Sequence, residues 1–353
     1  MTAAPAVARL SSAAVARLSS AAATRLTSAA GLVAVTQWYW QLLVTLGVLI
    51  VVLTIAAGLI WYERRLLSLV QDRYGPNRVG PAGLLQVLAD TFKILFKEDW
   101  VPPFSDRRVF VVAPSVVLVT ALLSFMVIPV AEGWVVLDVN IGLLFVLAMS
   151  SLAVYSVVLA GWSSRSKYSL VGGLRAAAQM VSYEVFMGLS LIGVVTLAGS
   201  FNLSAIVEAQ HRSVYYVFPQ FIGFVVFLVA GFAETRRIPF DLVEAESELV
   251  AGYHTEYSGM KFGLFLVGEY VAITLISALI VTLFFGGWLG PWLPGVLWFL
   301  IKTFVFITLF IVVRGTFPRP RYDQLMALGW KGMLPLSLLN LLITGAIVVA
   351  RAG

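Results

Sequence analysis

A dense group of ionisable residues lies between positions 234 and 248 of this chain. It comprises five carboxylates and two arginines: Glu234, Arg236, Arg237, Asp241, Glu244, Glu246 and Glu248. Only 12% of the 353 residues are charged and 60% are hydrophobic, so the group stands out from its surroundings. Charged side chains at or inside a bilayer are energetically expensive and usually functional. This stretch is therefore the first candidate for chemistry.

The chemistry that this spacing favours is proton binding. Asp241, Glu244 and Glu248 recur at three- and four-residue steps, so on a helix they would share one face. Carboxylates that share a poorly hydrated site cannot all ionise, and some of them then hold protons near neutral pH. The alternative is a solvated acidic loop or an interface for a basic partner. The apolar flanks and Pro239 favour a folded, partly buried loop.

Two further carboxylates and one lysine fall inside apolar runs. Glu184 and Glu269 are functional candidates because an intramembrane carboxylate rarely has a purely structural role. The alternative for Glu184 is a hydrogen bond to a neighbouring Ser182 or Tyr183. Lys302 either extends its ammonium group to an interface or pairs with an inner acid.

These side chains need a membrane-spanning scaffold to position them. The mean hydropathy is +0.94, and several runs approach the roughly 20 apolar residues with which a helix crosses a bilayer. They cover residues 39–62, 109–130, 141–162, 177–199, 217–233, 262–286, 294–314 and 332–351, of which the fifth is the shortest. The sequence predicts an all-α polytopic membrane protein with eight transmembrane helices.

The domain organisation follows from the same pattern. Residues 37–353 are predicted to form a single membrane domain. The preceding residues 1–36 contain an eight-residue repeat, since residues 7–14 recur at 15–22 and in degenerate form at 23–30. We expect this low-complexity tail to be disordered or peripheral.

Lys and Arg are distributed unevenly between the loops. The loops after the first, third, fifth and seventh runs are rich in them, whereas the loops after the second, fourth and sixth hold only Arg212. By the positive-inside rule, the basic loops face the cytoplasm and both termini face the periplasm of a bacterial inner membrane. The net charge of +6 is thereby explained by topology, and nucleic-acid binding is not indicated.

Redox ligands are scarce in this sequence. Cysteine is absent, which excludes disulfides, thiolate metal sites and iron–sulfur clusters. The two histidines, His211 and His254, fall in loops on opposite sides of the predicted topology, so a shared haem or metal site is disfavoured. We expect no redox centre and no metal site in this chain.

The first cytoplasmic loop contains an amphipathic segment. In residues 83–97, apolar side chains recur at three- and four-residue steps, with Asp90, Lys93 and Lys97 largely opposite. This pattern predicts a helix of interfacial type, lying on the membrane or under a partner protein. The preceding GPNRVGP at residues 75–81 lacks the lysine and the helix context of a phosphate-binding loop.

Longer motifs carry a family resemblance. They are ERRL at 63–66, QDRYGPNRVGPAGLLQ at 71–86, ADTFK at 89–93, KEDW at 97–100, GWSS at 161–164, SKYSL at 166–170, SYE at 182–184, PFDL at 239–242, EAESELVAGYHTEYSG at 244–259, RYDQLM at 321–326 and LGWK at 328–331. From about Tyr39 to its C-terminus, the chain resembles the H-subunit family of NADH-quinone oxidoreductase, respiratory complex I.

The resemblance implies a function. Members of that family join the peripheral arm to the membrane arm, form much of the tunnel for quinone (ubiquinone or a relative), and couple its reduction to proton translocation. Quinone would be the substrate, while NADH, FMN and iron–sulfur clusters would belong to partner subunits. The implied partners are the peripheral quinone-module subunits on the cytoplasmic face, small and antiporter-like membrane subunits, and membrane lipid.

Matching motif positions carry the family's site residues onto this chain. The resemblance assigns the quinone tunnel to Arg64, Arg73, Asp90 and Arg314. It assigns proton coupling to Glu184, Glu234, Arg237, Asp241, Glu244, Glu246, Glu248, Glu256, Glu269 and Lys302. The chain departs from the family pattern at Arg236, where many relatives have Asn, and this extra cation bears on the proton affinity of the cluster.

Two other functions remain open at this point. One is the membrane anchor of a related hydrogenase or another ferredoxin- or F420-linked complex, which shares the fold but need not use quinone. The other is a stand-alone secondary transporter. Such proteins often contain internal repeats, and the two halves of this chain show none.

Overall fold

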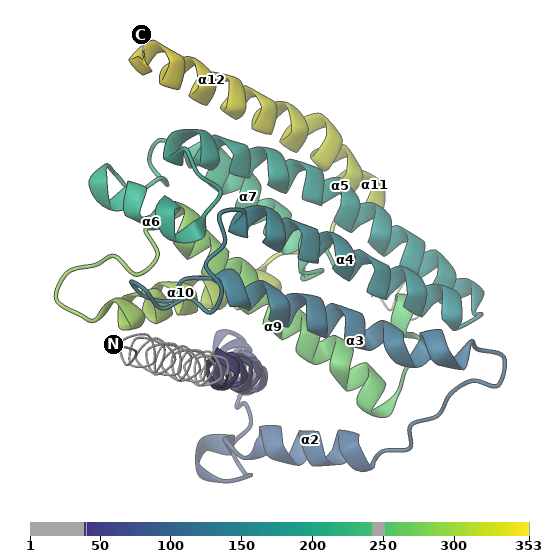
Figure 1. Cartoon of the computed structure of the whole chain (residues 1–353). Coiled ribbons are helices and arrows are strands. Elements are labelled where there is room, and N and C mark those ends of the chain that lie inside the picture. The colour runs from purple at the N-terminus through teal and green to yellow at the C-terminus, as the bar shows by residue number, and fades with distance from the viewer. Residues whose placement is uncertain (1–38, 40, 242–250, 353) are drawn as a thin grey trace, which may run out of the picture. The chain divides into compact units, whose positions relative to one another are not determined.

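The computed structural model describes residue 39 and residues 41–241 and 251–352. The chain divides into two compact units, Met1–Val48 and Leu49–Gly353. In the first unit, Tyr39 and residues 41–48 are helical, and the predicted tail at residues 1–36 lies outside the described part. The second unit holds the helices that position the candidate site (Figure 1).

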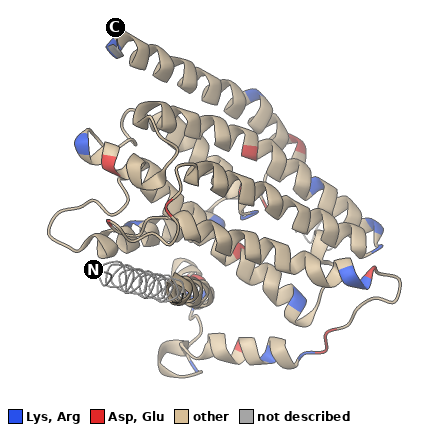
Figure 2. Cartoon of the chain, viewed as in Figure 1, with Lys and Arg blue, Asp and Glu red and all other residues tan. Residues whose placement is uncertain are grey.

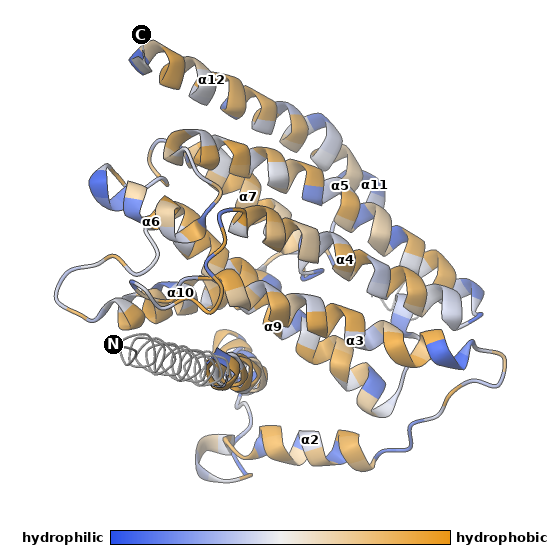
Figure 3. Ribbon diagram, in the orientation of Figure 1, coloured by the Kyte–Doolittle hydropathy of each residue, from blue (hydrophilic) through white to orange (hydrophobic). Residues whose placement is uncertain are grey.

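In the described chain, seven helical spans are long and apolar enough to cross a membrane. They are Gln41–Val70, Arg107–Val127, Gly142–Ser163, Lys167–Ala198, Gly259–Phe284, Gly295–Thr316 and Tyr322–Arg351. Apolar residues dominate these helices in Figure 3, and Figure 2 shows few charged residues along them. The all-α, multi-pass membrane architecture predicted from the sequence is confirmed.

The predicted count of eight spans is not confirmed. The fifth apolar run forms α7 (Phe221–Glu234), which has 14 residues. At a rise of about 1.5 Å per residue it is about 21 Å long, shorter than the roughly 30 Å hydrocarbon core of a bilayer. The helix ends at Glu234 because the following residues turn, with Arg236 at a φ of 54°.

The second unit is built around neighbouring antiparallel helices. Helix α4 (Gly142–Ser163) packs between α3 (Arg107–Ser124) and α5 (Lys167–Ala198). The central α9 (Gly259–Phe284) packs on α3 and α10 (Gly295–Thr316), and 72% of its most apolar window is buried. Helix α12 (Leu334–Ala352) follows α11 (Tyr322–Ala327) and packs on α5 (Figure 1).

Two of the shorter helices in the described fold are α2 (Gln86–Phe96) and α6 (Leu203–Arg212). The predicted amphipathic helix is present as α2, which has no buried residue and exposes Leu88, Phe92 and Phe96. Helix α6 lies between α5 and α7 in the chain and is capped by the Asn202 side chain, which accepts from Ala205 N.

A close approach brings the segment after residue 250 against α5. The 3-10 turn η3 (Gly252–His254) packs on α5 at Gly172. A Cβ atom at Gly172 would lie 2.7 Å from the Gly252 Cα, so only glycine permits this contact. The approach positions Tyr253, which is fully buried.

Candidate functional site

The centre of the candidate site is a buried group of four alternating charges. Arg237 Nη1 donates to both carboxylate oxygens of Glu63 at 3.1 Å. Arg314, near the end of α10, donates to the same carboxylate. On its other side, Arg237 Nε forms an ion pair with Glu269 of α9. The order Arg314–Glu63–Arg237–Glu269 joins three helices to the turn after α7, and we call it the charge chain.

Burial makes each member of the charge chain depend on its neighbours. The side chains of Glu63 and Arg237 are each 5% exposed, and that of Glu269 is 13% exposed. The Arg237 guanidinium also lies 4.6 Å from the Tyr270 ring centroid, a favourable cation–π contact. Two cations and two anions cancel, so no net charge is buried, whereas removal of one member would leave a buried charge uncompensated.

The short length of α7 explains why these charges lie so deep. The chain begins its approach to α7 beside the last turn of α9, where Val217 N donates to Phe284 O at 3.0 Å. Helix α7 then runs only as far as Glu234, and Arg237 contacts Glu269, ten residues after the first residue of α9. Those ten residues correspond to about 15 Å of helix. The charged turn is therefore placed well inside the apolar span.

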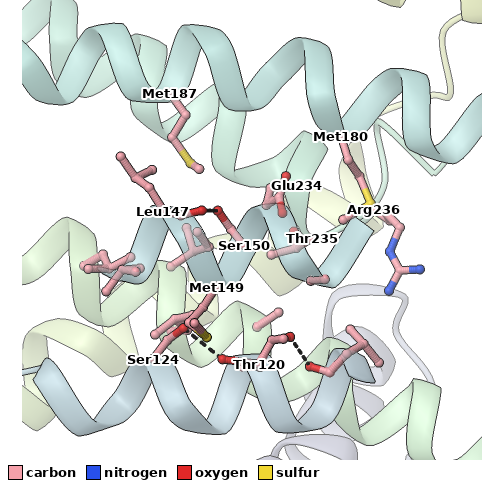
Figure 4. A pocket seen from close by; sticks show the side chains of 18 of the residues that line it. Thr120, Ser124, Leu147, Met149, Ser150, Met180, Met187, Glu234, Thr235 and Arg236 are labelled. Carbon is pink, nitrogen blue, oxygen red and sulfur yellow. Dashed lines mark hydrogen bonds between the residues drawn. The ribbon is translucent and has the colours of Figure 1, made fainter. Parts of the chain in front are cut away.

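A cavity adjoins the charge chain. Helices α3, α4, α5, α7 and α9 enclose about 50 Å³, which is room for a few water molecules. Its polar lining includes Glu234, Arg236 and Glu269, together with the hydroxyls of Thr120 and Ser150 (Figure 4). Among the described residues, Glu234 Oε2 has no hydrogen-bond partner although it is buried. A carboxylate oxygen of this kind suits an ordered water in the cavity.

Glu184 lies beside this cavity and is held by α4. Its Oε1 accepts hydrogen bonds from Ser150 at 2.9 Å and from Ser151 at 2.5 Å. Glu184 is also close enough to Glu234 for the two carboxylates to interact electrostatically. Sequence reasoning offered Ser182 or Tyr183 as the alternative partner of Glu184. In the described part of the chain the donors to Glu184 are Ser150 and Ser151, and Tyr183 donates to Leu325 O at 3.0 Å.

Arg236 ties the end of α7 to the segment after residue 250. Its Nη1 donates to the Tyr253 hydroxyl at 2.6 Å, and its guanidinium lies 5.0 Å from the centroid of the same ring. Gln179 of α5 holds the turn from the other side, donating to Ala233 O at 3.0 Å and Phe240 O at 2.9 Å. These contacts fix the turn in a single arrangement beside the cavity.

Tyr257 anchors the same segment to α3. Its ring stacks on Phe110 with centroids 4.0 Å apart, and its hydroxyl donates to Phe110 O at 3.2 Å. Burial raises the pKa of Tyr257 to about 12, so the hydroxyl keeps its proton at physiological pH. The segment between η3 and α9 is thus fixed at both Tyr253 and Tyr257.

Comparison with known proteins now decides the family. The family described as NADH dehydrogenase matches residues 43–345, which is most of the chain. The chain belongs to this family. A protein of Methylococcus capsulatus, named as the H subunit of NADH-quinone oxidoreductase, is 63% identical over 305 residues, covering 86% of this chain and 96% of that relative. The resemblance predicted from the motifs is confirmed.

For this member of the NADH dehydrogenase family, the structure brings together part of the predicted tunnel set. Arg64 Nη1 donates to Asp90 Oδ2 at 2.7 Å, which links the helix Gln41–Val70 to α2. Arg314 belongs to the charge chain instead. Arg73 is exposed and donates to the Gln71 side chain at 2.8 Å.

The predicted coupling residues fall into separate groups. Glu234, Arg237 and Glu269 are at the charge chain or the cavity, with Glu184 alongside. Asp241 pairs with Arg319 at 3.1 Å, and Glu256 is half-buried in the segment before α9. The predicted residues Glu244, Glu246 and Glu248 lie outside the described residues.

Lys302 is far from the charge chain. It precedes Arg314 by 12 residues on α10, about 18 Å along the helix. Its Nζ donates to the carbonyls of Phe285, Gly287 and Leu289 at 2.8, 3.2 and 2.6 Å. In the described chain, Lys302 therefore binds the turn after α9 rather than an inner acid.

Sequence reasoning missed Glu63 as a site residue. Glu63 follows an aromatic pair and precedes two arginines, a pattern typical of a helix end at the membrane surface. The helix instead continues to Val70, and Glu63 is 4% exposed. One feature of the sequence could have identified it: the helical pattern continues without a break for several residues after Glu63, so Glu63 is not at the helix end. Within the described ranges, no three His, Asp or Glu side chains are grouped in a way that could hold a metal.

Proposed function

We propose that this chain is the membrane subunit of a proton-pumping NADH:quinone oxidoreductase, in which it links quinone reduction to proton movement. The observation that carries the proposal is the charge chain, which runs from the half-exposed Arg314 to Glu269 in the wall of a buried, mostly apolar cavity. Charge placed at this depth in an apolar helical bundle is typical of ion or proton pathways.

The quinone path is the first part of the proposal. Arg64, Asp90 and Arg73 lie around the junction between the helix Gln41–Val70 and α2, where exposed apolar side chains of α2 accompany the charges. A polar head group with an apolar tail suits such a surface. Arg314 would sense charge that develops on the quinone and transmit it to Glu63. NADH, FMN and iron–sulfur clusters are assigned to partner subunits.

Coupling is the second part. A new negative charge near Arg314 weakens its attraction for Glu63, and Glu63 then attracts Arg237 more strongly. Arg237 in turn moves away from Glu269, which becomes a better proton acceptor. Glu234 and Glu184 would continue the proton path beyond the cavity, with Asp241, Glu244, Glu246, Glu248 and Glu256 in the loop beside it. Coupled carboxylates in a poorly hydrated site are suited to proton transfer.

The partners and location follow from this role. We assign the basic loops to the cytoplasmic face, under the peripheral quinone-module subunits, and the lateral helix faces to small and antiporter-like membrane subunits. The membrane is the bacterial inner membrane, and both termini are assigned to the periplasm.

The test replaces two inner carboxylates in the assembled complex. Glu269→Gln and Glu184→Gln each remove a proton-binding group at nearly constant volume. We expect the rate of proton pumping by inverted vesicles to fall by about a hundredfold, the lower end of what a positioned acid–base group contributes. Glu208→Gln is the matched control, because Glu208 is exposed on α6 with Arg212 4.0 Å away. Unchanged pumping in both inner variants would contradict the proposal.

A further inference from the structure

Two adjacent serines of α4, Ser150 and Ser151, contact Glu184. Both hydroxyls reach the same oxygen, Glu184 Oε1. Only Ser150 is part of the cavity lining, and it is half-buried there (Figure 4). Ser151 is exposed on the outer side of α4. The two serines therefore share an acceptor but face different surroundings.

The hydroxyl protons of this pair have a second acceptor. The Leu147 carbonyl oxygen lies 2.8 Å from Ser150 Oγ and 3.1 Å from Ser151 Oγ. Each serine has a single hydroxyl proton and can donate it to only one acceptor at a time. An ionised Glu184 favours donation by both serines. A protonated Glu184 needs an acceptor for its own proton, and a serine that turns to Leu147 supplies one.

From this geometry we infer that Ser150 relays protons between the cavity and Glu184. This inference rests on the proposed function and extends it to the hydroxyl groups. In the forward direction, protonated Glu234 or Glu269 gives its proton to a cavity water as that water gives a proton to Ser150 Oγ and Ser150 gives its own proton to Glu184 Oε1. One proton thus moves from one carboxyl group to another, and the water and Ser150 each end with the protons they began with.

The surroundings of the cavity supply what this relay requires. Glu234 and Glu269 lie in its wall as proton donors, and about 50 Å³ is enough for the connecting waters. Glu184 and Glu234 repel each other when both are ionised. Transfer of a proton from one carboxylate to the other through Ser150 relocates the negative charge without placing both charges in the apolar span together.

Three serine variants of the assembled complex test the relay in inverted vesicles. Ser150→Ala removes the cavity-facing hydroxyl, and we expect the rate of proton pumping to fall by about a hundredfold. Ser150→Thr retains a hydroxyl and should restore most of the pumping. Ser151→Ala is the matched control, because it removes the same number of hydrogen bonds to the same Glu184 oxygen. It should retain most of the pumping.

A spectroscopic readout separates a relay from packing. Protonated Glu184 gives a carboxyl C=O band in infrared difference spectra of the complex reduced by NADH, and Glu184→Gln identifies that band by removing it. In Ser151→Ala we expect the band to appear at a shifted frequency, because one hydrogen bond is lost. In Ser150→Ala it should fail to appear at the rate of turnover.

The possible outcomes distinguish the inference from the proposed function. If Glu184→Gln abolishes pumping and Ser150→Ala does not, the relay is wrong and the proposed function stands. If Glu184→Gln has no effect while Glu269→Gln does, the relay is again wrong and the proposed function stands; if neither variant has an effect, the proposed function itself fails. Equal losses in Ser150→Ala and Ser151→Ala without rescue by Ser150→Thr would show that the pair is only structural, and would also overturn the relay.

Discussion

At the scale of single residues, Glu63 is the side chain on which most of the buried charge depends. It accepts from Arg237 and Arg314 and is almost fully buried. Glu63→Gln would remove the anion that Arg237 and Arg314 share and leave Arg237 with only Glu269 as an anion in the charge chain. Breaking a buried pair in this way costs about 3–5 kcal/mol. We expect a lower midpoint of thermal inactivation for the assembled complex, measured as loss of NADH:quinone activity on heating.

A double-mutant cycle provides the control for this prediction. Combining Glu63→Gln with Arg237→Gln removes one anion and one cation, so the loss should be smaller than the sum of the two single losses. Additive losses would mean that the two side chains do not interact. A surface pair offers a comparison: Arg64→Gln at the exposed Arg64–Asp90 pair should cost no more than about 1 kcal/mol.

Glu63 also shows which members of the candidate site the sequence could predict. Glu234, Arg237 and Glu269 were identified because charge in an apolar run is conspicuous. Glu63 was not, because its neighbours Arg64 and Arg65 give it the appearance of an interfacial residue. Its partners lie 174 and 251 positions away in the chain. Pairings at that distance are determined by tertiary packing, which periodicity in a single sequence does not report.

At the scale of elements, the short helix α7 determines the site. The apolar run at 217–233 was predicted from the sequence. The buried position of the charges that follow it was not predicted, because hydropathy gives the length of a segment but not the level at which it ends beside a neighbouring helix. The hydrogen bond from Val217 N to Phe284 O fixes one end of α7 at the last turn of α9. Its 14 residues then end at the level of Glu269. A longer helix would have carried Arg236 and Arg237 to the surface.

The packing of η3 on α5 gives a prediction at the same scale. Gly172→Ala places a Cβ atom 2.7 Å from the Gly252 Cα, so η3 must move away from α5. Tyr253 would move with it and lose its contact with Arg236. We expect reduced thermal stability of the complex and fewer protons pumped per NADH.

Another glycine of α5 provides the matched control for that substitution. A Cβ atom at Gly188 would meet nothing within 4 Å. Gly188→Ala should leave pumping intact and stabilise the helix by about 0.5–1 kcal/mol, since alanine loses less backbone entropy on folding. Equal effects at Gly172 and Gly188 would show that the η3 contact is unimportant.

At the scale of the second unit, the contacts between α6 and α9 indicate whether the chain crosses the membrane at α7. The Gln210 side chain of α6 donates to Thr282 O at 2.9 Å and accepts from Gly286 N at 3.0 Å. The end of α6 and the end of α9 therefore lie at the same end of the helical bundle. Helix α9 is long enough to cross, so the chain between α6 and α9 must first have returned to the opposite end, and α7 is the long helix described in that part of the chain.

This geometry predicts the sidedness of the loops, and the absence of cysteine from the sequence makes labelling direct. Ser213→Cys follows α6, Trp292→Cys replaces a fully exposed residue in the loop after α9, and Asn77→Cys lies in the basic first loop. A membrane-impermeant maleimide should label the first two in spheroplasts and the third in inverted vesicles. Labelling of Ser213→Cys and Trp292→Cys from opposite sides would mean that α7 does not cross. The buried charges would then require a different account, because the depth of Arg237 depends on α7 and α9 running side by side through the same apolar layer.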